Sequence, residues 1–164
     1  MIRIQKAEND DLDTVHRLAH EIWPSSYLEI LGKAQLDYML DKIYSLPSLE
    51  HQFHVLKHSF IIVLDNVIPV GFASYSPHAD TTVYHLNKIY VLPAQQGKNI
   101  GKTILDFIIE ETKKGGATTL QLNVNRYNKA LHFYEKQGFK IIREEDIDIG
   151  SGYFMNDYVM ELKL

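Results

Sequence analysis

The chain has 164 residues, of which 45% are hydrophobic, 23% are charged and 11% are aromatic. This length and apolar content suffice for one folded domain with a sizeable core, and they exclude a disordered or collagen-like chain. The absence of cysteine excludes disulfides, thiolate nucleophiles and Cys-ligated zinc, and the formal net charge of −4 argues against a nucleic-acid partner.

The apolar residues occur in short runs. No run approaches the roughly 18 to 20 consecutive apolar residues that a membrane span requires, and the first four residues lack the apolar stretch of a signal peptide. We therefore expect a cytoplasmic protein with no membrane partner. Two acidic segments, 8–13 and 144–148, are interpreted as solvated faces or helix starts.

The first third of the chain is predicted to be mostly helical after one short strand. Residues 2–4 alternate between apolar and polar, and Asn9 to Asp11 can cap a helix whose apolar residues recur every three or four positions from Leu12 to Ile22. Pro24 is expected to stop or bend this helix. A second amphipathic helix follows over residues 36–43, with Pro47 beyond its end.

From residue 59 onward, strand and helix patterns alternate. The sequence predicts a hairpin over 60–64 and 67–75, a strand over 82–92, a helix over 99–114, a strand over 118–124, a helix from about 128 that ends at Gly138, and closing strands over 139–142 and 153–162. This order predicts an α/β (α+β) fold, with a mixed sheet covered by helices and one domain over residues 1–164.

A strand, a polar turn and the N-terminus of a helix follow one another at residues 91–102. The first turn of a helix has N–H groups without intrahelical partners and lies at the positive end of the helix dipole, so it can bind a pyrophosphate. Gly97 and Gly101 allow the phosphates to approach the backbone closely, while Lys98 and Lys102 add positive charge. Neither the Walker nor the dinucleotide pattern is met, and ordinary helix capping is the alternative interpretation.

Two ordered motifs resemble those of the GNAT superfamily of acetyltransferases. Residues 96–101, Gln-Gly-Lys-Asn-Ile-Gly, resemble its acetyl-CoA signature Gln/Arg-x-x-Gly-x-Gly/Ala, with Asn99 in place of the central glycine. Asparagine tolerates left-handed dihedral angles better than most residues. Residues 125–139 are similar to the family element Asn-x-x-Ala-x-x-x-Tyr-Glu-Lys-x-Gly-Phe. The Asn-to-Ala spacing is one residue shorter here, so Asn125 or Asn128 matches the family's asparagine.

The resemblance implies a GNAT-type sheet of six to seven mostly antiparallel strands flanked by about four helices. It implies acetyl-CoA as cosubstrate, no metal, and direct transfer of acetyl to a primary amine in a ternary complex, where the acceptor is a polyamine, another small amine or a peptide amine. Many relatives dimerise through their closing strands, and the resemblance therefore implies a homodimer. The cofactor-binding residues that it implies are Tyr90, Val91, Gln96, Gly97, Lys98, Asn99, Ile100, Gly101, Lys102, Asn125 and Asn128.

Tyr134 occupies the position of the family's general acid, which protonates the departing thiolate. Without the motif, a tyrosine among apolar helix residues would be interpreted as part of the core. For the general base, the strand before the turn offers His85, whose side chain has a reference pKa near 6.5, and Asn87. A chain of water molecules is a further alternative for this role.

Three aromatic residues, Trp23, Tyr27 and Tyr38, lie in the helical region that walls the acceptor site in the family, although an amphipathic helix core is the more common role for such residues. The histidines show no metal motif such as His-Glu-x-x-His. Two other functions stay open. One is a non-catalytic acyl-CoA-binding sensor with the same fold, and the other is a nucleotide-binding module that uses the same helix N-terminus.

Overall fold

The structure, a computed structural model, describes all residues from Met1 to Leu164. It divides the chain into two compact units, which are residues 1–76 with 87–108 and residues 77–86 with 109–164. None of its helices combines the length and the apolar composition that a membrane crossing needs.

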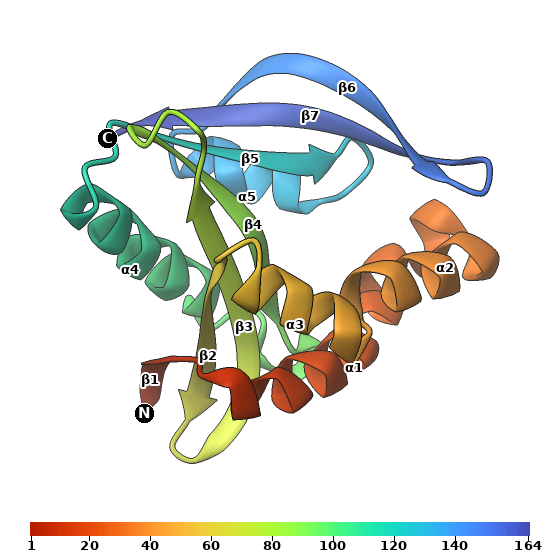
Figure 1. The fold of residues 1–164 in the computed structure, drawn as a ribbon, viewed down its shortest axis with the longest axis horizontal. Helices are drawn as coiled ribbons and strands as arrows, with labels where there is room; N and C mark the ends of the chain where they lie inside the picture. Colours follow the sequence, from red (N-terminus) through yellow and green to blue (C-terminus); the bar gives the residue numbers. More distant parts are fainter. The chain divides into compact units, whose positions relative to one another are not determined.

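The first unit joins antiparallel strands to the N-terminal helices. Its elements are β1 (Ile2–Lys6), the 3₁₀ helix η1 (Asn9–Asp11), α1 (Leu12–Leu31), α2 (Lys33–Tyr44), α3 (Leu46–His54), β2 (Ser59–Asp65), β3 (Ile68–Pro77), the last part of β4 (Val83–Val91), the 3₁₀ helix η2 (Pro93–Gln95) and the first part of α4 (Ile100–Lys114). Strand β2 pairs antiparallel with both β1 and β3. Helix α1 packs against α2 and α3 (Figure 1).

The second unit is built around a long hairpin. Its elements are the first part of β4, the last part of α4, β5 (Thr119–Asn125), α5 (Ala130–Lys136), β6 (Lys140–Gly150) and β7 (Tyr153–Lys163). Strand β5 runs parallel to β4, whereas β7 runs antiparallel to both β5 and β6. Figure 1 shows β6 and β7 as two long blue strands joined by a tight turn.

The strand order is β1-β2-β3-β4-β5-β7-β6 in a seven-stranded sheet. Strand β4 contributes residues to both units. The expected α/β fold with a mixed, mostly antiparallel sheet is therefore confirmed. There are five α-helices where about four were expected, because residues 46–54 form a helix that the sequence pattern did not predict.

Proline positions explain two differences from the predicted helices. Pro24 lies inside α1, and the helix continues to Leu31 before it ends at Gly32, which has a φ of 78°. Trp23 and Tyr27, on either side of Pro24, are both buried, and this packing outweighs the lost backbone hydrogen bond. Pro47 lies in the first turn of α3, where a missing N–H group has no intrahelical partner to lose.

The acidic segment 144–148 lies within β6, so its interpretation as a helix start is wrong. The strand pairs along its length with β7, from Lys140 opposite Glu161 to Gly150 opposite Tyr153. Most of these acidic side chains are exposed, which agrees with a solvated face. Pairing with β7 decides the conformation, because strand propensity depends strongly on tertiary context.

The first unit buries one lysine without a carboxylate partner. Lys88 is 7% exposed, and its Nζ lies 5.5 Å from the ring centroid of Tyr44 and 5.7 Å from that of Phe60. Burial lowers the pKa of the Lys88 ammonium to about 8. Burial, together with the positive charge of Lys88, lowers the pKa of His58 to about 4. A charged Lys88 therefore reduces the stability of the folded state at neutral pH.

Replacing Lys88 by Met is expected to raise the free energy of unfolding at pH 7 by about 2 kcal/mol, because the desolvation penalty that lowers the pKa exceeds the lost cation–π contacts. The folded-state pKa is depressed, so the wild type gains stability as the pH rises from about 8 toward the reference value of 10.5. The advantage of the variant should shrink over this range. Denaturant unfolding from pH 6 to 10 measures it. The exposed Lys113→Met control should show a small, pH-independent change, and an equal response in both variants would contradict the prediction.

Candidate active site

The turn between β4 and α4 leaves a series of backbone N–H groups without protein acceptors. Gly97 and Asn99 have φ values of 83° and 63°. The first N–H group near the start of α4 that donates to backbone is that of Thr103, which bonds to the Asn99 carbonyl at 3.1 Å. The six N–H groups from Gly97 to Lys102 have no protein acceptor. They lie at the positive end of a 15-residue helix, where an anion is stabilised.

The side chains of this turn contribute less positive charge than the sequence suggests. Lys102 Nζ forms an ion pair with Asp106 at 2.8 Å, whereas Lys98 Nζ donates to Gln95 Oε1 at 3.2 Å. Both lysines are exposed. The Ile100 side chain is 3% exposed and fixes the start of the helix. The capacity of the turn to bind an anion therefore depends mainly on its backbone.

Strands β3 and β4 approach each other closely at the end of β4. A Cβ atom on Gly71 would lie 2.6 Å from the Tyr90 carbonyl oxygen, so only glycine fits at this position. The Leu92 N–H group donates to the Val70 carbonyl at 2.8 Å, and Gln96 Nε2 donates to the Val91 carbonyl at 3.4 Å. This contact joins two of the predicted cofactor-binding residues, Val91 and Gln96.

The Tyr90 side chain belongs to an aromatic cluster within the first unit. Its hydroxyl lies 3.0 Å from that of Tyr27, and its ring lies 5.9 Å from that of Trp23. Two of the three aromatic residues predicted near the acceptor site are therefore close to Tyr90. Tyr38 interacts instead with Lys42, whose Nζ donates to the Tyr38 hydroxyl at 3.4 Å.

The two candidate asparagines of the second unit shape the segment between β5 and α5. Asn125 Oδ1 accepts a hydrogen bond from the Tyr127 N–H at 2.9 Å, and Asn128 Oδ1 accepts one from the Ala130 N–H at 3.0 Å. Such side-chain bonds to backbone two residues ahead form Asx turns. Both side-chain carbonyls thus hold the local backbone, and α5 begins at Ala130.

The two candidate catalytic residues also lie in the second unit. Tyr134 on α5 is 8% exposed, and its ring packs 5.4 Å from Phe133 and 5.8 Å from Phe139. His85 on β4 is opposite Gln121 of β5, and its ring lies 5.6 Å from that of His78. The structure therefore groups Tyr90, Val91 and residues 96–102 in one unit, and His85, Asn125, Asn128 and Tyr134 in the other.

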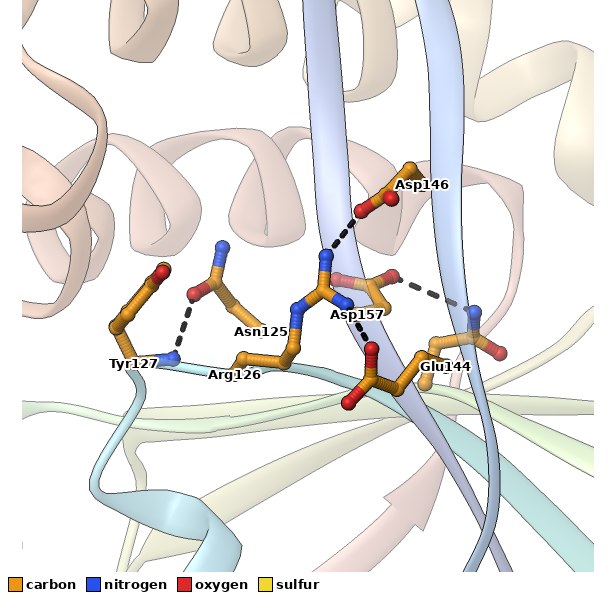
Figure 2. Close-up of polar contacts among 7 residues, drawn as sticks. Asn125, Arg126, Tyr127, Glu144, Asp146 and Asp157 are labelled. Atoms are coloured by element: carbon orange, nitrogen blue, oxygen red, sulfur yellow. Dashed lines mark hydrogen bonds and ion pairs between the residues drawn. The ribbon is translucent and has the colours of Figure 1, made fainter.

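Sequence reasoning missed a polar network on β5, β6 and β7 (Figure 2). Arg126 donates to Glu144 at 2.8 Å and also bonds to Asp146. Asp157 is 2% exposed, and its Oδ2 accepts from the amide of Asn123 at 3.3 Å. No pattern in the sequence marks Asp157, because its neighbours come from strands paired across long sequence distances. No group of three or more His, Cys, Asp or Glu side chains is arranged to hold a metal ion.

Comparison with known proteins matches residues 12–139 to the model of the acetyltransferase (GNAT) family. The chain is 31% identical over 169 residues to a spermidine N(1)-acetyltransferase of Thermoplasma acidophilum, an alignment that covers 99% of this chain and 97% of that protein. It is 30% identical over 122 residues to the [ribosomal protein bS18]-alanine N-acetyltransferase of Haemophilus influenzae, covering 66% and 79% of the two chains.

Solved structures agree with these relationships. The crystal structure of the PaiA N-acetyltransferase of Thermoplasma acidophilum in complex with coenzyme A superposes with a TM-score of 0.84 and 28% identity, covering 100% of this chain and 99% of that one. An N-acetyltransferase-related structure from Rhodopseudomonas palustris, at 18% identity and a TM-score of 0.83, shares the fold and covers 99% and 95% of the two chains. The chain therefore belongs to the acetyltransferase (GNAT) family, and the expectation that it is an acyltransferase is confirmed.

Proposed function

We propose that this protein transfers the acetyl group of acetyl-CoA to the primary amine of a small acceptor, such as a polyamine, by direct attack in a ternary complex. The observation that supports this proposal most is the series of six free N–H groups from Gly97 to Lys102. A pyrophosphate carries enough acceptor oxygens to bond several of these groups at once. The residues of the turn therefore fit the diphosphate of coenzyme A.

The acceptor class is supported by the relatives. One of them, similar along nearly its whole length, is named for acetylation of spermidine, and the net charge of −4 is compatible with a cationic acceptor. The same acidity suits other amines, and the relatives include one that is named for a ribosomal-protein alanine. A primary amine is the chemistry that these acceptors share.

The proposed division of roles is the one that the family resemblance implies. The turn at 97–102 holds the diphosphate, and the backbone at Tyr90 and Val91 aligns the pantetheine arm. Acetyl-CoA supplies an activated carbonyl and a thiolate leaving group. Tyr134 carries the only phenol in α5. It donates a proton to the departing sulfur, because a neutral thiol is a better leaving group than a thiolate.

Binding of acetyl-CoA is tested by thermal unfolding with separate additions of acetyl-CoA, CoA, ATP and NAD. Saturating acetyl-CoA and CoA are expected to stabilise the fold by about 2.7 kcal/mol at 100 times their dissociation constants, by mass action, while ATP and NAD have no comparable effect. Thiol release with a panel of primary amines then tests transfer. Stabilisation without thiol release would indicate a sensor, and stabilisation by ATP or NAD alone would indicate a nucleotide-binding module.

Asn99 offers a test of the turn itself. Because its φ is 63°, Asn99→Val should destabilise the protein by about 1 to 2 kcal/mol and weaken CoA binding, since a β-branched residue resists the left-handed conformation. Asn99→Gly should bind CoA at least as tightly as the wild type. Denaturant unfolding and calorimetric titration with CoA measure the two effects. Equal CoA affinity in both variants would remove the backbone of this turn from the binding site.

Tyr134→Phe should lower the turnover number by roughly 10²- to 10⁴-fold, the usual contribution of a general acid, and it should leave the dissociation constant of acetyl-CoA nearly unchanged. Tyr127→Phe is a suitable control, because Tyr127 is 73% exposed. Steady-state kinetics and calorimetry of both variants give the comparison. Wild-type turnover in the Tyr134 variant would exclude the hydroxyl as the acid.

A further inference from the structure

One face of the strands of the second unit carries mostly polar side chains around the buried Val159, which pairs with Asn123. Directly paired residues point to the same side of a sheet, and so do residues two apart on one strand. The register therefore places on one face the residues His85, Gln121, Asn123, Asn125, Glu145, Asp157 and Glu161. The opposite face has the buried apolar residues Leu120, Leu122, Val124 and Met160.

Three carboxylates lie on the polar face, and two of them have cationic partners. Glu145 accepts from Arg143 Nε at 2.8 Å, which lowers the pKa of the Glu145 carboxyl. Glu161 pairs with Lys163 at 2.8 Å and accepts from Gln121 at 2.9 Å. Both carboxylates are thus stabilised in the ionised form by groups of the protein itself.

Asp157 is the exception. It is 2% exposed, and its single side-chain hydrogen bond is the one from Asn123 to Oδ2. Its Oδ1 has no partner within the protein. The nearby Arg126 donates to Glu144 and Asp146 instead (Figure 2). Burial raises the pKa of the Asp157 carboxyl, and the charge of Glu145 acts in the same direction. Burial of an ionised carboxylate reduces the stability of the fold unless a cation or further hydrogen bonds compensate the lost hydration.

Asn123 and His85 place Asp157 within a larger polar group. The Asn123 amide donates to Asp157 and, at 3.5 Å, to Glu145. His85 lies opposite Gln121 of β5 on the same face, so the histidine predicted as the base shares this face with the carboxylates. Of the three carboxylates on this face, Asp157 alone is buried, and it alone forms no ion pair with a cationic side chain.

We infer that Asp157 Oδ1 binds the ammonium group of the acceptor and takes its proton before acetyl transfer. This inference rests on the proposed function and names a residue for the base, for which the sequence offered His85, Asn87 or a chain of water molecules. An ammonium group is a cation with three donors, and it would satisfy Oδ1 by a charge-assisted hydrogen bond.

The proton and electron balance follows directly. The acceptor ammonium gives one proton to Asp157 Oδ1, and the free amine forms a bond from nitrogen to the acetyl carbonyl carbon. The carbon–sulfur bond breaks, and its electron pair stays on sulfur, which takes a proton from Tyr134. The nitrogen returns its second proton to Tyr134, and Asp157 releases its proton to water. The products are the acetamide, CoA thiol and one proton.

The test compares Asp157→Asn with His85→Gln and with Glu110→Gln, an exposed acid on α4 that serves as the charge control. With spermidine as the acceptor, Asp157→Asn should lower kcat/KM for the amine by at least about 100-fold, leave the KM for acetyl-CoA unchanged and abolish the acidic limb of the pH–rate profile. An Asp157→Asn variant with wild-type kcat/KM and an unchanged profile, or a larger loss and an altered profile in His85→Gln alone, would overturn the inference.

Stability gives a second readout, which does not need turnover. The folded-state pKa of Asp157 is raised, so the wild type loses stability as the pH rises through that value. Asp157→Asn should therefore increase the melting temperature at pH 7 but not at pH 3, and it should remove the stabilisation of the wild type by millimolar spermidine. A lower melting temperature at pH 7 with spermidine binding retained would show a purely structural residue.

The two proposals fail in different ways. A wild type that is stabilised by acetyl-CoA and by spermidine but transfers no acetyl group would contradict the proposed function, while loss of spermidine binding in Asp157→Asn would still support the ammonium site. If the Asp157→Asn variant acetylates spermidine as efficiently as the wild type, only the role of Asp157 is contradicted.

Discussion

The left-handed backbone at Gly97 and Asn99 is the constraint on which the proposed cofactor site depends. Two positive φ values within three residues turn the chain from β4 into α4 without using the intervening N–H groups. Because the first backbone bond at the start of the helix comes from Thr103, six donors stay available at the positive end of the helix dipole. Without this turn, the lysine side chains alone would attract an anion only weakly, because Lys102 forms an ion pair with Asp106.

The close approach of β3 to β4 at Gly71 is a second backbone constraint. Glycine is required because any side chain would meet the Tyr90 carbonyl. The end of β4 is therefore held by backbone contacts, and its aromatic side chain packs against Tyr27 and Trp23. In the proposed mechanism, the first unit would hold the cofactor through its backbone, whereas the proton transfers assigned to the second unit use side chains.

Two buried ionisable groups, Lys88 and Asp157, have perturbed pKa values, but their surroundings suit them to different roles. The pKa of Lys88 is lowered and that of Asp157 is raised, so both shifts favour the neutral form. Each group therefore reduces the stability of the folded state when it is charged. Lys88 is covered by the rings of Tyr44 and Phe60. Asp157 lies beside Asn123 on a polar face and keeps a free oxygen. Perturbed pKa values are common at functional sites, but only the second environment suits exchange of a proton with an amine.

The sequence alone determined the order of strands and helices from residue 59 onward and the turn at 96–101, because both depend on local periodicity and on glycine and asparagine at fixed spacing. It also placed Tyr134 on a helix that ends at Gly138. The tertiary structure decided what local patterns do not contain. Packing on both sides of Pro24 carried α1 to Leu31, and pairing with β7 made residues 144–148 a strand. Asp157 became a candidate base only when β5, β6 and β7 were in register, because the face that a strand residue shares with residues far away in sequence is set by cross-strand pairing.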